Sequence, residues 1–285
     1  MKVKIVAEIG INHQASVAVA ADLMAVAKAA GCDAVKFQKR DLALAIPPHM
    51  RLQMRPTPWG TMHYEDYKQR MEFDAGDFAQ VAEAARKIGI EWSASVFDPP
   101  SVGFAVMLGV PWLKLPSAAI TDHETLDAAA ATGVPLVLST GGATWGEIDA
   151  AVARVDASRL TLLHCCSVYP HTPAQARLRL IPELRQRFGC AVGYSGHEEP
   201  GSHEVTLGAV AMGACFVERH ITLSRHQWGS DQRASLEPAE LAEMVRQIRR
   251  LSEALTVGGE RPVDDAERAK IQTMRRSAWA GKGGE

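Results

Sequence analysis

Eight short apolar segments recur along the chain, and each runs into polar residues with functional side chains. The segments are 5–9, 34–37, 90–97, 112–115, 134–138, 160–166, 191–194 and 214–217. Stretches with helical spacing of apolar residues lie between them, and many end at a glycine, as helices commonly do. This alternation predicts βαβ units and a parallel sheet. Eight such strands predict an α/β protein with a single-domain (β/α)8 TIM barrel, whose strand ends all meet at one mouth.

The barrel is expected to occupy residues 1–258, with 259–285 as a C-terminal extension or arm. Helices are expected at 17–30, 77–87, 122–132, 144–155, 178–188, 198–212 and 237–255. One connection, residues 39–73 after the second strand, is far longer than the others. A long loop at the catalytic end of a barrel is typically a lid or a substrate-shaping insert. A dimer contact is the alternative.

Composition excludes several classes of function. The chain has 285 residues, of which 47% are hydrophobic, and a net charge of −2, so a large core is possible and a nucleic-acid surface is not indicated. No apolar run approaches the roughly 18–20 residues that span a bilayer. The start of the chain lacks the apolar core of a signal peptide. Its five cysteines have no zinc-site spacing. We therefore expect a cytoplasmic protein with reduced thiols and no membrane or nucleic-acid partner.

Two lysines lie within or at the ends of apolar strands, where a charge is unfavourable unless an anion neutralises it. Lys36 and Lys114 are therefore expected to bind a phosphate or a carboxylate in the barrel mouth. The alternative is a buried ion pair with Glu8 or Glu218. Hydroxyl groups and backbone N–H groups surround bound phosphates, and small hydroxyl residues end other strands, namely Ser95, Ser117, Ser139 and Ser195. The pattern predicts an anion site.

Two histidines end the seventh and eighth strands, which are neighbours in such a barrel. His197 and His220 are therefore expected to share one divalent cation, since imidazole suits Mn, Fe, Co or Zn. With Glu218 and Asp231 nearby, coordination positions would remain for water or a substrate oxygen. Hydrogen-bonded structural histidines are the alternative. Glu8, near the end of the first strand, is the best carboxylate for proton transfer or hydroxyl binding, unless it only neutralises Lys36.

At these positions the chain resembles the sialic acid synthase (N-acetylneuraminate synthase) family of phosphoenolpyruvate-dependent barrel enzymes. The matching motifs are AEIGINH at 7–13, DAVKFQ at 33–38, LKLPS at 113–117, LSTGG at 138–142, LHCCSVYP at 163–170, VGYSGH at 192–197, GAVAMGACFVERHIT at 208–222 and WGSDQRASLEP at 228–238. They occur in order and cover roughly residues 5 to 255.

The resemblance implies a transferase, active as a homodimer, that condenses phosphoenolpyruvate with an open-chain aldose to a 3-deoxy-ulosonic acid, with phosphate leaving by C–O cleavage. It implies catalytic roles for Glu8, Lys36, Gln38 and Asp231. It implies a divalent metal, Mn²⁺ or else Mg²⁺ or Co²⁺, on His197 and His220. The implied substrate-binding residues are Ser95, Lys114, Ser117, Ser139, Ser167, Tyr169, Ser195 and Glu218. Tyr169 would wall the sugar pocket.

The chain departs from the family pattern at several positions. Gly196 stands where members commonly have an aspartate, so a carboxylate near the metal is expected to be absent. Ser167 replaces a common asparagine, and Gln232 stands where a histidine near the sugar is common. Family members also carry a C-terminal antifreeze-like domain that reaches the substrate's N-acyl group, and this chain stops at Glu285, near where that domain would begin. An acceptor other than N-acetylmannosamine is therefore expected.

Two rival functions remain open at this point. A Schiff-base aldolase acting on a 2-keto-3-deoxy sugar acid would use Lys36 or Lys114 as its nucleophile and would need no metal. A non-catalytic barrel that binds a sugar acid is compatible with Gly196 and Gln232. The histidine pair speaks against the aldolase.

Overall fold

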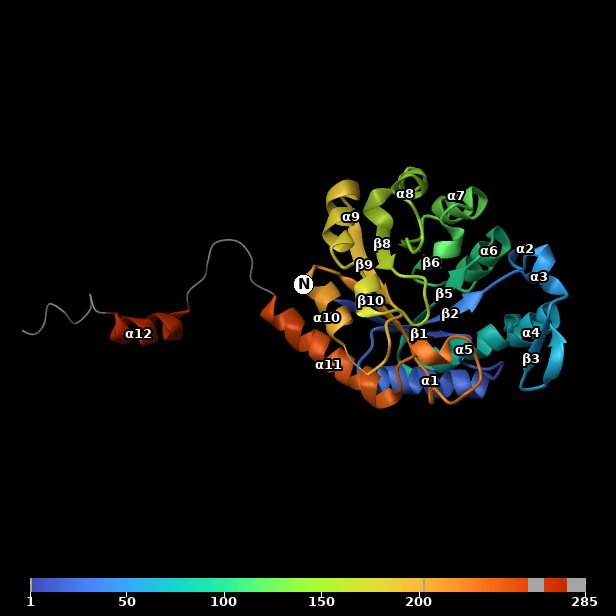
Figure 1. Cartoon of the computed structure of the whole chain (residues 1–285), viewed down its shortest axis with the longest axis horizontal. Coiled ribbons are helices and arrows are strands. Elements are labelled where there is room, and N and C mark those ends of the chain that lie inside the picture. Colours follow the sequence, from blue (N-terminus) through green and yellow to red (C-terminus); the bar gives the residue numbers. More distant parts are fainter. Residues whose placement is uncertain (1, 202, 256–263, 276–285) are drawn as a thin grey trace, which may run out of the picture.

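Eight parallel strands close into a barrel in the order β1-β10-β9-β8-β7-β6-β5-β2, which confirms the predicted (β/α)8 fold. A computed structural model describes residues 2–201, 203–255 and 264–275 (Figure 1). The barrel strands are β1 (Lys4–Gly10), β2 (Ala34–Lys39), β5 (Glu91–Val96), β6 (Leu113–Leu115), β7 (Leu136–Ser139), β8 (Leu160–Cys165), β9 (Ala191–Gly196) and β10 (Phe216–His220).

Helices surround the strands as expected, with two differences. They are α1 (Val17–Ala30), α5 (Ala75–Ile88), α6 (Pro99–Met107), α7 (His123–Ala131), α8 (Trp145–Val152), α9 (Leu180–Phe188), α10 (Glu204–Ala211) and α11 (Pro238–Ala254). Helix α6 was not predicted, although Asp98 caps it by accepting a hydrogen bond from the Ser101 N–H and Pro99 opens its first turn. Helix α10 begins six residues later than predicted because Glu198 instead bridges to His171.

The connection after β2 is a folded insert rather than a loop. Residues 39–73 contain α2 (Leu42–Ala45), α3 (Pro48–Arg51), the antiparallel hairpin of β3 (Met54–Thr57) and β4 (Gly60–His63), and α4 (Tyr64–Met71). The insert projects to one side of the barrel (Figure 1). Tyr67 and Met71 of α4 are buried with Ile11, which follows β1. This small apolar cluster attaches the insert to the mouth of the barrel.

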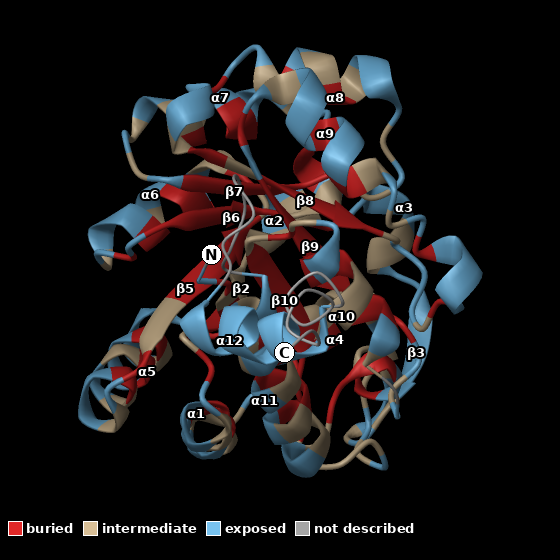
Figure 2. Cartoon of the chain, turned by 90° about the vertical axis from the view of Figure 1, so that its left-hand side faces the viewer, coloured by how far each residue is buried: buried red, intermediate tan, exposed pale blue. Residues whose placement is uncertain are grey.

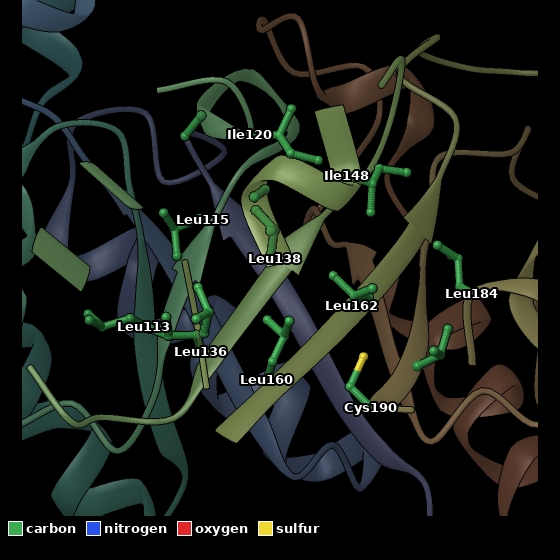
Figure 3. Packing of buried hydrophobic residues seen from close by; sticks show 14 of the residues in the cluster. Leu113, Leu115, Ile120, Leu136, Leu138, Ile148, Leu160, Leu162, Leu184 and Cys190 are labelled. Carbon is green, nitrogen blue, oxygen red and sulfur yellow. The ribbon is translucent and has the colours of Figure 1, made fainter. Parts of the chain in front are cut away.

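Most of the hydrophobic core lies between the strands and the helices. Figure 2 shows buried strands at the centre and helices whose outer faces are exposed. In Figure 3, leucines of β6, β7 and β8 pack with Ile148 of α8 and Leu184 of α9. A second cluster packs α1, α5 and α11 against the opposite strands. Both clusters use the outward-facing residues of the strands, so the inward-facing residues remain free for other roles.

A smaller apolar cluster closes the inside of the barrel below the mouth, and we call it the apolar plug. It consists of Val6, Ala34, Trp112, Val137, Leu163 and Phe216, and the Trp112 and Phe216 rings meet edge to face at 5.5 Å. Residues two positions apart on a strand face the same side. The next inward-facing positions are therefore Glu8, Lys36, Lys114, Ser139, Cys165 and Glu218. We call them the polar layer.

Helix α12 (Asp265–Met274) belongs to the expected C-terminal extension, whose residues 259–263 and 276–285 lie outside the described part of the chain. None of the helices that the structure describes has the length and apolar character required to cross a membrane.

Candidate active site

The barrel mouth contains a cavity of about 530 Å³ directly above the polar layer. Every site residue expected from the sequence lines it, namely Glu8, Lys36, Gln38, Ser95, Lys114, Ser117, Ser139, Ser167, Tyr169, Ser195, His197, Glu218, His220 and Asp231. A second cavity of about 600 Å³ lies beside it near α8 and α9, but few of its lining residues carry charge. The convergence of ionisable groups makes the first cavity the candidate site. The individual roles of these residues remain predictions.

Lys36 is the centre of a buried ion-pair network. Its Nζ lies 2.7 Å from Glu8 Oε2 and 3.6 Å from Glu218 Oε1, and it also donates a hydrogen bond to Ser95 Oγ. Strand register explains the meeting, because Glu8 of β1 is paired with Lys36 of β2. The buried ion pair that was the alternative from the sequence is therefore present. A ligand of Lys36 would have to bind beside Glu8 and Glu218.

Lys114 is in a different position. It is 3% exposed, and its Nζ donates to Ser139 Oγ at 2.7 Å and to the Leu115 carbonyl at 3.2 Å. Among the described residues, no carboxylate oxygen lies within 4.0 Å of it. Burial lowers the pKa of Lys114, Glu218 opposes that shift, and the charge of Lys36 adds to it. A buried ammonium without a counter-ion is unfavourable until an anion binds next to it.

Glu218 lies between the two lysines. Burial alone would raise the pKa of Glu218, but Lys36 and Lys114 hold that pKa below its ordinary value. Its Oε1 accepts a hydrogen bond from Ser195 Oγ at 3.3 Å, whereas its Oε2 is buried without a hydrogen-bond partner among the described residues. The carboxylate therefore stays charged and keeps one oxygen for a ligand.

Gly141 forms a cradle with three small side chains. Its backbone N–H donates to Ser117 Oγ at 3.0 Å. A Cβ at this position would lie 2.3 Å from Ser167 Oγ, 2.7 Å from Cys165 Sγ and 2.8 Å from Ser117 Oγ. A glycine is therefore required here, because the backbone approaches the hydroxyls too closely for any side chain. Backbone N–H groups beside hydroxyls are typical of anion sites.

Three of the expected catalytic residues meet around Gly10. Gln38 Nε2 donates to Glu8 Oε1 at 3.0 Å. A Cβ on Gly10 would lie 3.2 Å from each of these two groups and 3.4 Å from Asp231 Oδ2. Gly10 has a φ of +54°, which favours glycine. The backbone therefore passes through the space between the carboxylates and the amide, where a larger residue would separate them.

The two histidines face each other across the cavity. The ring centroids of His197 and His220 are 5.4 Å apart. His197 Nδ1 is 3.0 Å from the Cys166 carbonyl, so Nδ1 carries the proton and Nε2 has a free lone pair. Burial, followed by the nearby His220, lowers the pKa of His197 well below its ordinary range, which favours the neutral imidazole. His220 Nδ1 is buried without a hydrogen-bond partner among the described residues.

This pair fits a divalent cation with an incomplete protein ligand set. The two nitrogens that could hold such an ion are Nε2 of His197, whose Nδ1 is hydrogen-bonded, and the unpartnered Nδ1 of His220. Asp231 Oδ2 lies 3.8 Å from His220 Nδ1. Within the described ranges, no group of three His, Cys, Asp or Glu side chains is placed to hold a metal. Any ion bound here therefore depends on water or substrate for its remaining ligands.

The structure corrects the expectation for position 196. Gly196 alternates with Ser195 and His197, so it faces the helices, and a Cβ there would lie 2.4 Å from Glu198 Oε2 and 2.8 Å from Arg219 Cδ. A carboxylate at 196 would lie beside Arg219 and not beside the histidines. Glu198 takes this place, because its Oε1 lies 2.5 Å from Arg219 Nη1. The glycine therefore removes no carboxylate from the cavity.

Tyr169, Ser167 and Gln232 differ in whether they reach the cavity. Tyr169 stacks on His197 with ring centroids 3.9 Å apart and forms part of the cavity wall. Ser167 lines the cavity at the Gly141 cradle. Gln232 is buried below the surface and does not line the cavity, since its Nε2 donates to the Trp228 carbonyl at 3.4 Å. Only the first two positions can contact a ligand directly.

Two charged residues of the insert, Arg40 and Lys68, also line the cavity and were not expected there from the sequence. Arg40 continues the inward-facing series of Lys36 and Gln38, so an alternation of two positions could have identified it. Lys68 lies on α4, and no pattern in the sequence places that helix above the mouth. Its position depends on the packing of the insert.

Comparisons with known proteins identify the family to which the chain belongs. The NeuB family's sequence model matches residues 23–260. An N-acetylneuraminate-9-phosphate synthase from Drosophila melanogaster is 38% identical over 252 residues, which cover 86% of this chain and 67% of the fly protein. An N,N'-diacetyllegionaminic acid synthase from Legionella pneumophila is 35% identical, covering 92% of this chain and 75% of that protein. An N-acetylneuraminic acid synthetase from Leptospira borgpetersenii, solved with citrate, matches with a TM-score of 0.86 and 30% identity over 99% of this chain and 94% of its own.

Proposed function

This chain belongs to the NeuB family and is an enzyme of the sialic acid synthase type, and from that premise we propose that it condenses phosphoenolpyruvate with an open-chain aldose. The products are a nonulosonic, sialic-acid-like acid and inorganic phosphate. The relatives are named as synthases of N-acetylneuraminate 9-phosphate and of diacetyllegionaminic acid, which differ in their acceptor sugars. The identity of the aldose therefore depends on residues particular to this chain.

One observation carries the proposal: Lys114 is buried in the cavity without a carboxylate partner among the described residues. Such a buried charge is unfavourable unless a ligand neutralises it, because the nearby Glu218 offsets only part of the effect of burial. Phosphoenolpyruvate has a phosphate and a carboxylate on one small frame. Lys114 binds the first with the Gly141 cradle, and Lys36, Ser95 and Ser195 bind the second. The relatives' names support this substrate class, and the cavity chemistry supports its location.

The reaction joins carbon 3 of phosphoenolpyruvate to the aldehyde carbon of the acceptor. Water adds to carbon 2, and phosphate leaves by cleavage of the bond between carbon 2 and oxygen. The aldehyde oxygen takes up one proton of the water and becomes a hydroxyl. The water oxygen becomes the carbonyl oxygen at carbon 2 as the other proton passes to the departing phosphate, so atoms and charge balance. Glu8 and Asp231, which meet beside Gly10, hold or accept protons from the water and the acceptor hydroxyls. Gln38 fixes Glu8, and Tyr169 covers one wall of the acceptor site.

His197 and His220 are the residues that would hold a divalent cation, with Mn²⁺ preferred and Mg²⁺ or Co²⁺ as alternatives. Such an ion supplies Lewis-acid polarisation of the acceptor's aldehyde oxygen when bound. The hydrogen bond from His197 to the Cys166 carbonyl orients this ring for that purpose. The unpartnered Nδ1 of His220 is available at the same place.

The test is release of phosphate from phosphoenolpyruvate, measured with and without an added aldose, Mn²⁺ and a chelator. The acceptors to compare are N-acetylmannosamine, mannose and their 6-phosphates. We expect release that requires an aldose and that the chelator abolishes. Lys114→Met should remove this activity without unfolding the protein. Release that does not depend on any aldose would contradict the proposal, and release that persists in the chelator would contradict its metal requirement.

A Schiff-base aldolase is the second candidate, and one observation favours it. Burial lowers the pKa of Lys114, as it does in lysines that act as amine nucleophiles. Borohydride reduction in the presence of pyruvate distinguishes the two functions, because only a Schiff base would be trapped as a stable adduct on Lys114. We expect no adduct by mass spectrometry.

A further inference from the structure

Two cations of the insert line the cavity and have no role in the condensation proposed above. The Arg40 guanidinium lies 4.3 Å from the Phe97 ring centroid, ion-pairs with Glu72 at 3.3 Å and donates a hydrogen bond to Gln38 Oε1. The Lys68 ammonium lies over the rings of Tyr64 and Tyr67, at 5.4 and 5.5 Å. We call Arg40 and Lys68 the mouth cations.

Lys68 lacks a counter-ion. Among the described residues, no carboxylate oxygen lies within 4.0 Å of its Nζ, whereas the neighbouring Lys39 pairs with Glu72 at 3.5 Å. Burial lowers the pKa of Lys68 to about 8, and the charge of Arg40 acts in the same direction. Asp231 and Glu72 act in the opposite direction but do not restore the ordinary value. The ammonium is therefore mostly charged at neutral pH, partly desolvated and without an ionic partner.

The mouth cations lie beyond the catalytic carboxylates. Lys36, Gln38 and Arg40 alternate along β2 and its end, so Arg40 lies about 13 Å farther along the strand than Lys36. Gln38 bonds to both Glu8 and Arg40 and so separates the two charged regions. Lys36 and Lys114 are already assigned to phosphoenolpyruvate. An acceptor with its aldehyde near the histidines would extend its other end toward Arg40 and Lys68.

We propose that Arg40 and Lys68 bind a phosphate monoester at the end of the acceptor opposite its aldehyde, so that the acceptor is an aldose phosphate. This inference rests on the proposed condensation and names its second substrate. A planar guanidinium and a mobile ammonium together suit the several oxygens of a phosphate. The relatives' names differ on this point, since the fly product carries a 9-phosphate and the Legionella product is named without one.

The kinetic test uses Lys68→Met, which removes the charge and keeps the length of the side chain. Arg70→Met is the matched control, because Arg70 is an exposed cation on the same helix that stacks on Trp59 and does not line the cavity. The kcat/KM is measured for mannose, N-acetylmannosamine and their 6-phosphates at saturating phosphoenolpyruvate. We expect the wild type to prefer the 6-phosphates at least tenfold.

Lys68→Met should reduce kcat/KM at least tenfold for the phosphorylated acceptors and less than twofold for the others, with Arg70→Met unchanged. Equal losses for both kinds of acceptor, or a wild-type preference for the unphosphorylated sugars, would overturn the inference. Direct binding of the sugar 6-phosphates, by calorimetry, separates it from the proposed function. If no aldose supports phosphate release, binding that requires Lys68 but not Arg70 still supports the subsite, and binding that is the same in all variants refutes it.

Discussion

The polar layer and the mouth cations are both positively charged regions of one cavity, but they are built differently. The polar layer is carried by barrel strands, and its lysines are 2–3% exposed. The mouth cations stand at the end of β2 and on α4, where the insert covers the barrel. Strands fix a side chain through register with two neighbours, whereas an insert fixes it through a few apolar contacts such as Ile11 with Tyr67 and Met71.

We assign different functions to the two regions: the polar layer takes part in the reaction, and the mouth cations select the acceptor. Groups on the strands cannot move without disrupting the barrel, which suits the charges that we propose to bind phosphoenolpyruvate. Groups on an insert can change between related enzymes without affecting the barrel, which suits the recognition of an acceptor that varies. The predictions below test whether the two regions are independent in this way.

The largest effect is expected at Lys114. Replacement by Met removes a buried charge that has no carboxylate within 4.0 Å among the described residues, although Lys114 also helps to keep Glu218 charged, so only a small loss of stability is expected in denaturant titrations. The kcat/KM for phosphoenolpyruvate should fall by about 10²–10³, the usual loss when a single electrostatic donor is removed from an active site. Lys36→Met is the contrasting variant, because it leaves Glu8 and Glu218 buried without their cation and should destabilise the protein by about 3–5 kcal/mol. Equal stability changes in both variants would contradict the distinction.

The next effect is expected at Gly141. Its replacement by Ala places a methyl group 2.3 Å from Ser167 Oγ, so the cradle must open. We expect a loss of about 10- to 100-fold in kcat/KM for phosphoenolpyruvate, since small displacements in a site have effects of this size. Gly146→Ala on α8 is the control, because a Cβ there meets nothing within 4 Å, and it should leave activity unchanged. An unaffected Gly141→Ala enzyme would show that the cradle does not bind the substrate.

The first of these predictions concerns residues that were identified from the sequence, whereas Gly141 was not among the predicted site residues. Lys36, Lys114, His197 and His220 follow apolar strand segments, and a parallel barrel brings all strand ends together, so their convergence needed no knowledge of packing. Two things could not be predicted. The pairing of Lys36 but not Lys114 depends on register between strands, and the position of Lys68 depends on how the insert folds. The predicted role of Gly196 was wrong because the direction of a strand residue depends on its phase relative to His197.

A smaller effect on kcat/KM is expected when the pH is changed, because Lys68 lines the mouth of the cavity. Lys68, whose pKa is about 8, must be protonated to bind an anion, and the groups that act on it are Arg40, Arg55, Glu72 and Asp231. Between pH 7 and pH 9 the phosphate monoester is already mostly a dianion, so the kcat/KM for a phosphorylated acceptor should fall about fivefold over this interval as Lys68 loses its proton. The ratio to the unphosphorylated acceptor removes any other titration from the comparison. A ratio that stays flat in the wild type would exclude Lys68 as the titrating group.

The smallest effect is expected on the stability of the protein at acidic pH, and it involves His13, which contacts the end of the insert. His13 stacks on Phe73 at the end of the insert, with ring centroids 3.9 Å apart, and its Nδ1 accepts a hydrogen bond from the Ala15 N–H. Burial, followed by the charge of Arg40, lowers the pKa of His13 to about 3. The unfolded chain therefore takes up this proton first as the pH falls, so the stabilisation is complete above pH 6.5 and is lost progressively below it.

Between pH 7 and pH 5.5 this difference amounts to about 1 kcal/mol of unfolding free energy. In His13→Asn, which can still accept the Ala15 hydrogen bond, the stability loss over that interval should be smaller by this amount in urea titrations. His49→Asn, at an exposed position of the insert, should behave as the wild type. The same acid dependence in both variants would count against His13.

The position of the apolar plug bears on the order in which substrates bind and products leave. Because Trp112, Phe216 and the other plug residues fill the barrel below the polar layer, ligands should reach the cavity from the mouth. In the proposed reaction phosphoenolpyruvate would occupy the deepest part of the cavity, so it should bind before the acceptor sugar. Product release would follow the reverse order. The sugar-acid product would have to leave the cavity before a new phosphoenolpyruvate molecule could bind at its bottom. If the substrates bind in this order, the acceptor sugar at high concentration should inhibit the reaction by blocking access of phosphoenolpyruvate to the cavity.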